Sequence, residues 1–338
     1  MAHFYLALGA KRQWTAARRL APAPVSFRRS SLSSTPGTTS HLSSLLSRVA
    51  AGDLSPATAA SQLAPLLVSG GARAEDVGGF AKIDHDRRRR VGFPEVIFGD
   101  GKTAGQIIDI LSAMIRDAKP QSNTAAIGGS PIVATRVSPE KWRLISEGLP
   151  GQLTYYADAR IVSFGAPLDL VAAGGDTQTE RSTGDAGLSG ETAGVTSIGK
   201  VAVLSAGTSD LRIAEEAAVL AELAGAEVSR FHDVGVAGIH RLLAAIPSVQ
   251  AAGVAICVAG MDGAMPGVVA GLVKCPVVAV PTSVGYGAAM SGIAPLLTML
   301  NACAPGVSVV NIDNGFGAAA FAVKLLKSSK AIGADAGQ

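Results

Sequence analysis

The sequence predicts an α/β protein in which a small α+β domain precedes a C-terminal, doubly wound, three-layer parallel sheet. Three observations lead to this prediction. From Val201 onward, short apolar segments suited to buried strands alternate with helix-like segments. The chain has 338 residues, enough for two domains of ordinary size. Apolar residues make up 48% and aromatic residues only 4%, with 40 glycines, and such small residues let helices pack closely on a sheet.

Residues 1–40 are basic, rich in serine and free of acidic residues, since the first carboxylate of the chain is Asp53. That composition is typical of an organelle transit peptide; a disordered tail without an address is the alternative. Its Ser/Thr/Pro-rich second half favours a chloroplast over a mitochondrion. If residues 1–40 are not a targeting signal, a cytoplasmic location is expected. The net charge is +3, but the chain after the leader is slightly acidic, which argues against a nucleic-acid partner. No apolar run reaches the roughly 20 residues that span a bilayer, so no membrane partner is expected.

The small N-terminal domain is expected over residues 41–173, followed by a polar, Gly/Thr-rich linker over 174–199. Apolar residues at helical spacing predict two short helices within 41–67, the second beginning at Ser55-Pro56. Further along, we expect an amphipathic helix over 104–118 and strand-and-turn segments over 124–138 and 159–167.

The C-terminal domain is expected over 200–327, with 328–338 as a tail. Its strand-like segments carry apolar residues on both faces, as in a parallel sheet covered by helices on both sides. The expected strands are 201–207, 226–235, 251–261, 275–283 and 306–313, and the expected helices are 211–225, 238–248, 267–274 and 293–303.

The loops that follow these strands are the predicted binding region, because doubly wound sheets bind ligands beyond the carboxyl ends of their strands. Thr208, Ser209 and Asp210 stand where the first helix begins. The free N–H groups of a helix start accept phosphate, although Ser209 or Asp210 could also simply cap the helix. His232 and His240 flank the second loop, where each is either a ligand contact or a structural residue.

The third and fourth loops are rich in glycine. Gly260 and Gly263 flank Asp262, which is either a general base or the side chain of an Asx turn. The fourth loop offers Thr282, Ser283 and Tyr286, and four consecutive polar loops at one sheet edge are a stronger signal than any one of them.

Three cysteines at scattered spacings form neither a disulfide framework nor a zinc signature, which favours a reducing compartment. Cys257 lies inside an apolar strand and is expected in the core, and Cys275 is expected to be structural. Cys303 follows a helical segment and precedes a strand, where it is either inert or a nucleophile.

Four consecutive arginines, 87–90, are usually a solvated face or a targeting signal. The alternative hypothesis is that Arg90 or Arg89 reaches a substrate phosphate or a neighbouring subunit, with Lys102 as a similar candidate. The GDGKT segment around Lys102 lacks the spacing of a P-loop.

Several segments together resemble the LarB family of carboxylase/hydrolases, which begin synthesis of the nickel-pincer nucleotide cofactor. They are GTSDLRIAEE, DVGVAGIHRLL, AGMDGAMPGVVAGLVKCPVVAVPTSVGYGA, LLTMLNACAPGVSVVNIDNGFGA and, in the small domain, DRRRRVGFPEVIFGDGKT. The C-terminal domain more distantly resembles the PurE aminoimidazole ribonucleotide carboxylase/mutase family, which implies a PurE/flavodoxin-like sheet. The resemblance covers about residues 41–325.

The resemblance implies a substrate and roles for residues. LarB enzymes carboxylate nicotinic acid adenine dinucleotide at C5 of the pyridinium ring and hydrolyse its phosphoanhydride. The products are pyridinium-3,5-biscarboxylic acid mononucleotide and AMP. The family's nucleophilic cysteine falls on Cys303 and its active-site acid on Asp262, where some bacterial members carry Glu. Its phosphate and ribose contacts fall on Thr208, Ser209 and Asp210, and the PurE relationship implies a homo-oligomer, an octamer.

The chemistry is consistent with these roles. An electron-poor pyridinium ring does not attack CO2 until a thiolate adds to it and creates an enamine-like carbon. A base then removes the ring proton, and loss of the thiolate restores aromaticity. CO2 or bicarbonate is therefore the co-substrate, His240 and loop N–H groups could stabilise the new carboxylate, and Mg2+ is expected to assist hydrolysis. Asp313 is its candidate ligand, with an Asx turn as the alternative.

Two other functions remain open. The first is a PurE-like enzyme acting on aminoimidazole ribonucleotide in purine biosynthesis, which would need no thiol because that substrate is already an enamine. The second is a non-catalytic module that binds nucleotides.

Overall fold

The computed structural model describes residues 44–59, 74–118, 131–149, 153–165 and 197–335, and it divides into two compact units at Leu67. In unit 1, residues 44–50 and 56–59 are helical, as predicted. The described residues of unit 2 contain three sheets: a two-stranded hairpin, a mixed four-stranded sheet and a parallel five-stranded sheet. The small domain predicted over 41–173 includes residues of both units. The predicted leader, and the predicted linker up to residue 196, lie outside the described residues.

The small domain of unit 2 is a mixed sheet with one short hairpin beside it. Strands β3 (Val96–Phe98) and β4 (Ile132–Thr135) are parallel. Strand β6 (Ile161–Phe164) runs antiparallel to β4 and to β5 (Leu153–Tyr156). The 104–118 helix is confirmed, but the hairpin and the helix α5 were not predicted. Helix α5 begins where Ser138 Oγ accepts the N–H of Lys141 and Pro139 occupies the first turn. The elements are β1 (Ala74–Val77), β2 (Ala81–Asp84), α3 (Arg87–Val91), β3 (Val96–Phe98), α4 (Ala104–Ala118), β4 (Ile132–Thr135), α5 (Pro139–Gly148), β5 (Leu153–Tyr156) and β6 (Ile161–Phe164), with sheet order β3-β4-β6-β5.

The C-terminal domain is a five-stranded, all-parallel sheet, which confirms the predicted fold class. The strands are β7 (Lys200–Ser205), β8 (Glu227–Phe231), β9 (Val254–Ala259), β10 (Val277–Pro281) and β11 (Val307–Val309), in the order β11-β10-β9-β7-β8. All residues of β9 and β10 are buried, as expected for strands covered on both faces, whereas β8 and β11 are partly exposed edges. The strand order reverses between β7 and β9, which makes this the switch point of the sheet.

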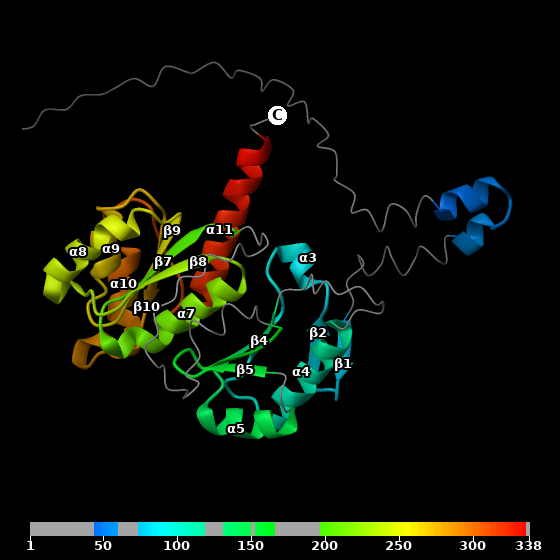
Figure 1. Ribbon diagram of the computed structural model, residues 1–338, viewed down its shortest axis with the longest axis horizontal. Coiled ribbons are helices and arrows are strands. Elements are labelled where there is room, and N and C mark those ends of the chain that lie inside the picture. Colours follow the sequence, from blue (N-terminus) through cyan, green and yellow to red (C-terminus); the bar gives the residue numbers. More distant parts are fainter. Residues whose placement is uncertain (1–43, 60–73, 119–130, 150–152, 166–196, 336–338) are drawn as a thin grey trace, which may run out of the picture. The chain divides into compact units, whose positions relative to one another are not determined.

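Helices cover both faces of this sheet, as Figure 1 shows. The helices are α7 (Leu211–Leu223), α8 (Ile239–Val249), α9 (Met265–Ala270), α10 (Ile293–Leu300) and α11 (Gly315–Asp335). Side chains of α8, α9 and α10 share a hydrophobic cluster with one face of the strands, and side chains of α7 and α11 share a second cluster with the other face. The domain therefore has three layers, as predicted.

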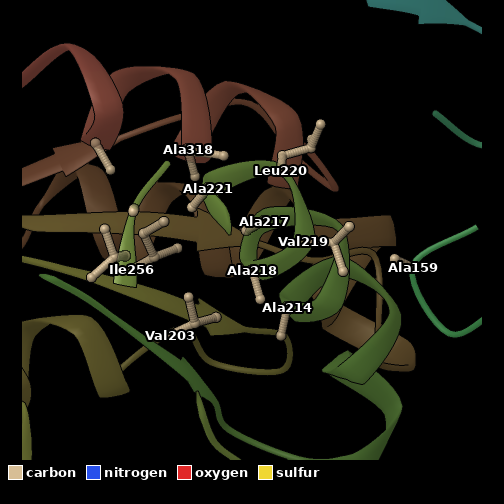
Figure 2. Close-up of a cluster of buried hydrophobic side chains, with 14 of the residues drawn as sticks. Ala159, Val203, Ala214, Ala217, Ala218, Val219, Leu220, Ala221, Ile256 and Ala318 are labelled. Atoms are coloured by element: carbon tan, nitrogen blue, oxygen red, sulfur yellow. The ribbon is translucent and has the colours of Figure 1, made fainter. Parts of the chain in front are cut away.

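Helix α7 packs against α11 through small side chains. Ala214, Ala217, Ala218 and Ala221 of α7 are fully buried, and Figure 2 shows them beside Ala318 of α11 and strand residues. Alanine keeps the two helices close to each other and to the sheet. No helix was predicted after residue 313, and α11 continues to Asp335 through most of the segment that we assigned to a tail.

The small sheet shares the second cluster. Val133, Tyr156 and Ile161 are buried together with residues of α7 and α11, whereas the helices α4 and α5 cover the other face of the small sheet. This shared core explains why both sheets form one compact unit. Within the described ranges, no helix has the length and apolar character needed to cross a membrane.

Candidate active site

A cavity of about 440 Å³ lies at the carboxyl ends of β7, β8 and β9, where the fold class predicts a ligand. We call it the switch-point cavity. Its lining residues come from the loops after these strands and from the loop after β10. They include Thr208, Ser209, Asp210, Gly260 and Asp262, so the structure brings these five predicted site residues together.

Asp210 organises the loops of this cavity rather than facing solvent. Its side chain is buried; Oδ1 accepts the hydroxyl of Thr282 at 2.7 Å and Oδ2 accepts the N–H of Gly207 at 3.0 Å. Burial raises the pKa of Asp210, whereas the hydrogen bonds from Thr282, Gly207 and Gly260 lower it. This carboxylate therefore connects the loops after β7, β9 and β10. Thr208 and Ser209 are exposed and offer the polar side chains of this loop to a ligand.

The loop after β9 contains Asp262 in the left-handed conformation, with φ 72°. Its Oδ1 accepts the N–H of Ala264 at 3.0 Å, so the Asx turn that we considered is present, while the exposed side chain still lines the cavity. At Gly260 a Cβ atom would lie 2.4 Å from the carbonyl oxygen of Val284. Only glycine lets the loops after β9 and β10 approach this closely.

The loop after β8 contributes an ion pair that was not predicted. Asp233 lines the cavity, and its carboxylate accepts a hydrogen bond from Arg241 on α8. The arginine belongs to the IHR segment that the resemblance already included, but nothing in the sequence paired it with Asp233. His232 lies near Ser205 and Glu215 instead of lining the cavity, and His240 is exposed and outside the lining as well.

Thr282, Ser283 and Tyr286 follow β10 but lie in different surroundings. Thr282 is fully buried and bonds Asp210, and the N–H of Ser283 donates to Asp313 Oδ1 at 2.8 Å. Tyr286 is 79% exposed and lines neither the switch-point cavity nor the second cavity described next.

Cys303 is exposed and lines a second cavity, of about 810 Å³, which we call the thiol cavity. It lies in the loop between α10 and β11, as predicted. The remaining walls are Gly263, Ala264, Gly267, Val268, Leu297, Thr298, Asn301, Ala302 and Ala304. The structure therefore places the two predicted catalytic residues at different cavities. The turn after β9 belongs to both, because Asp262 lines one cavity and Gly263 the other.

The other two cysteines are structural. Cys257 is fully buried in the centre of β9, and burial raises the pKa of its thiol. Cys275, just before β10, is half-buried, and burial raises its pKa too. Both placements agree with the expectation from the sequence.

Asp313 does not form a metal site with its neighbours. Among the described residues, no group of three or more His, Cys, Asp or Glu side chains is placed to hold a metal ion. Asp313 has φ 55° and accepts the N–H of Ser283, so its carboxylate connects two loops. The residues present do not fit a metal held by the protein alone.

The cationic candidates of the small domain bind groups within that domain. The guanidinium of Arg90 pairs with Asp84, which holds the pKa of that carboxyl below its ordinary value. Lys102 Nζ donates to the carbonyl oxygen of Phe98 at 2.9 Å. The side chain of Arg89 lies outside the described part of the structure.

Comparisons with known proteins agree with this architecture. A family model for the LarB/PurE-like N-terminal domain matches residues 74–166, and the AIR carboxylase model matches residues 200–335. The uncharacterized protein MJ0165 of Methanocaldococcus jannaschii is 37% identical over 257 residues, which are 75% of this chain and 86% of that protein. The N5-carboxyaminoimidazole ribonucleotide mutase of the same organism is 36% identical over 131 residues, 37% of this chain and 78% of that enzyme.

The first family match covers the small domain, strands β1 to β6. The second covers the parallel sheet, strands β7 to β11. The similarity to MJ0165 extends over most of each protein. The chain therefore belongs to the LarB-like family, with a PurE-like AIR carboxylase domain following its N-terminal domain.

Proposed function

We propose that the protein carboxylates C5 of the pyridinium ring of nicotinic acid adenine dinucleotide and hydrolyses its phosphoanhydride. The products would be pyridinium-3,5-biscarboxylic acid mononucleotide and AMP. The observation that carries this proposal is the pairing of a LarB-type N-terminal domain with an AIR carboxylase domain. Membership of the family supports carboxylase-related chemistry, and the exposed thiol of Cys303 supplies the nucleophile that a pyridinium substrate needs.

The carboxylation step uses one nucleophile and one base. The sulfur of Cys303 bonds to the ring, which neutralises the pyridinium charge and makes C5 nucleophilic. C5 then attacks CO2, Asp262 accepts the C5 proton, and cleavage of the carbon–sulfur bond restores the aromatic ring and the thiolate. Because the turn after β9 lines both cavities, the proposal places the ring over this turn, between Asp262 and Cys303.

The switch-point cavity is the proposed site for the nucleotide phosphates. Thr208 and Ser209 are exposed at the beginning of a helix, where N–H groups and the helix dipole favour an anion. Arg241 donates a hydrogen bond to the carboxylate of Asp233, and Asp233 lines the cavity. A Mg2+ ion that enters with the substrate phosphates would assist hydrolysis without a site formed by the protein alone.

A single incubation tests the proposed reaction. The protein is given nicotinic acid adenine dinucleotide and ¹³C-bicarbonate with Mg2+, and products are followed by mass spectrometry. AMP together with a mononucleotide carrying one ¹³C carboxylate supports the proposal. Absence of both products under conditions where the dinucleotide binds would contradict it.

Mutase activity on N5-carboxyaminoimidazole ribonucleotide is the second candidate, and the similarity to the archaeal mutase favours it. That similarity covers 37% of this chain and omits the small domain, whereas the similarity to MJ0165 covers 75%. Turnover of the aminoimidazole substrate in the same assay would establish this alternative. Binding of nucleotides without turnover of either substrate would instead indicate a binding module.

We also propose that the protein is a homo-oligomer and that residues 1–40 direct it to a chloroplast. Met290, Ile293, Leu297 and Leu300 are exposed apolar side chains in or next to α10, an arrangement that favours self-association. Sedimentation of the wild type and of Leu297→Asp tests the first proposal, because a charge on this surface should lower the mass of the assembly. A fluorescent fusion of residues 1–40 tests the second.

A further inference from the structure

Arg136, the first residue after β4, has an unusual backbone conformation. Its φ of 56° lies in the left-handed region, which is unfavourable for an L-residue. Such a conformation persists where surrounding contacts hold it. The guanidinium of Arg136 lies 5.2 Å from the ring centroid of Phe98, it donates to the carbonyl oxygen of Asp313, and its Nε is 3.5 Å from Glu216. Asp313 and Glu216 both belong to the AIR carboxylase domain.

Glu216 is a buried carboxylate with little compensation. Its side chain is 3% exposed, and neither carboxylate oxygen has a well-formed hydrogen bond within the described residues. A Cβ atom at Gly315 would lie 2.9 Å from Oε2, so the beginning of α11 closes over it. Burial raises the pKa of Glu216, and the charges of Arg136 and Arg212 lower it. Arg136 therefore stabilises the fold by partly compensating this buried charge. A test of any further role has to be separated from this one.

The second task follows from the bond to Asp313. The N–H of Asp313 donates to the carbonyl oxygen of Pro281, and its Oδ1 accepts the N–H of Ser283, both at 2.8 Å. The next contact is the hydroxyl of Thr282, which donates to Asp210 in the switch-point cavity. Hydrogen bonds, together with the peptide link between the neighbours Thr282 and Ser283, thus lead from Arg136 in the small domain to the loop after β7.

We propose that Arg136 is a positioning residue, through which the small domain holds the switch-point cavity in its binding shape. Without the guanidinium, the loop before α11 loses its tether, and the loop after β10 loses the fixed carboxylate of Asp313. Thr282 is then held less firmly, and so is Asp210, which accepts its hydroxyl. Gly207, whose N–H donates to Asp210, becomes more mobile in turn. The small domain would thereby contribute to nucleotide affinity without touching the nucleotide. Only the statement on nucleotide affinity rests on the proposed function.

Three variants separate the two tasks of Arg136. Glu216→Gln removes the buried charge but keeps the tether to Asp313. Arg136→Met removes the hydrogen bond to Asp313 and also the ion pair of Glu216, whose charge then has only Arg212 and the N–H of Phe316 to compensate it, so this variant could fail to fold. The double variant R136M/E216Q removes both charges and the tether, and it therefore carries the test. In each variant, hydrogen exchange is measured without ligand at the amides of Gly207 and Ser283, with amides of β9 reporting global stability.

Relative to the amides of β9, we expect protection at Gly207 and Ser283 to fall about tenfold in R136M/E216Q and to stay at the wild-type level in E216Q. Arg136→Lys, whose ammonium still donates to Asp313, should restore part of the protection. Wild-type protection at both amides in R136M/E216Q would overturn the proposal. AMP titrations give an independent arm: its affinity should fall about fivefold or more in the double variant and not in E216Q. If the wild type binds no AMP, the proposed nucleotide site fails, while hydrogen exchange still decides the role of Arg136.

Discussion

The two cavities of the AIR carboxylase domain differ in how they are built. The switch-point cavity, about 440 Å³, is formed by four loops, and hydrogen bonds to the buried carboxylate of Asp210 join three of them, those after β7, β9 and β10. The thiol cavity, about 810 Å³, is larger, and exposed side chains of α10 such as Leu297 form its walls. Its one reactive group, Cys303, is exposed.

Under the proposed function, this difference would separate binding of the substrate from the chemical step. Loops connected by buried hydrogen bonds can recognise a fixed shape such as a phosphate, because little has to be ordered when the ligand binds. An exposed thiol can react with a ligand that enters its cavity. The turn at Asp262 and Gly263 joins the two cavities. Loss of Cys303 or of Asp262 in the joining turn should therefore abolish chemistry, whereas changes to the buried hydrogen bonds of the switch-point cavity should weaken binding.

The largest effect is expected for Cys303→Ser. Serine does not form the ring adduct readily, so carboxylation should fall by about 10³-fold or more. Because Cys303 is exposed, the free energy of unfolding should change by less than about 0.5 kcal/mol. The measurement is incorporation of ¹³C from bicarbonate. Cys275→Ser is the matched control, since Cys275 lines neither cavity, and it should retain carboxylation. Full activity in C303S would remove the thiol cavity from the mechanism.

The next effect is expected for Asp262→Asn. Asparagine tolerates the left-handed conformation, and its oxygen can still accept the N–H of Ala264, so the turn should survive. Loss of the base should lower kcat by about 10²–10⁴-fold with little change in KM. Steady-state rates with the dinucleotide measure both constants. An increase in KM at unchanged kcat would instead make Asp262 a binding residue of the switch-point cavity.

Two threonines allow a matched comparison of the cavities. Thr282→Val removes the donor to the buried Asp210, which should cost about 1–3 kcal/mol of stability and weaken AMP binding about tenfold. Thr298→Val is the same substitution at the thiol cavity, where the hydroxyl donates to the carbonyl oxygen of Ala294 in its own helix. It should change the free energy of unfolding by less than about 0.5 kcal/mol. Equal effects in calorimetry and AMP titration would contradict the proposed difference between the cavities.

The fold of the larger domain could be predicted from sequence because buried parallel strands are apolar throughout and their ends are polar. The rule for doubly wound sheets then placed Thr208, Gly260 and Asp262 at one cavity. The hairpin β1–β2 escaped prediction because its strands, AEDV and AKID, are four residues long and half polar. Strands this short give too few residues for a period of two to be recognised.

The remaining features of the site depend on contacts between distant parts of the chain. Arg136 and Asp313 are 177 residues apart, and no local pattern pairs them. The same reason hid the bond between Asp210 and Thr282, which are 72 residues apart. The sequence also indicates which loops meet at a sheet edge. It does not indicate which side chains of these loops line the same cavity. The separation of Cys303 from the switch-point cavity therefore could not be foreseen.

The smallest effect is expected at Glu216, which lines neither cavity, and it depends on pH. Burial is the largest influence on the pKa of Glu216 and raises it above 4.5, against the lowering effects of Arg136 and Arg212. The neutral form is therefore favoured by folding, and this contribution is complete below pH 4.5 and is lost as pH rises through the raised pKa. Because Gln does not ionise, the stability of wild type relative to Glu216→Gln should fall over this window. The fall should be about 1.4 kcal/mol for each unit by which the pKa is raised. Urea denaturation of both proteins between pH 4 and pH 8 measures the difference. A difference that grows with pH would mean that the pair with Arg136 outweighs burial.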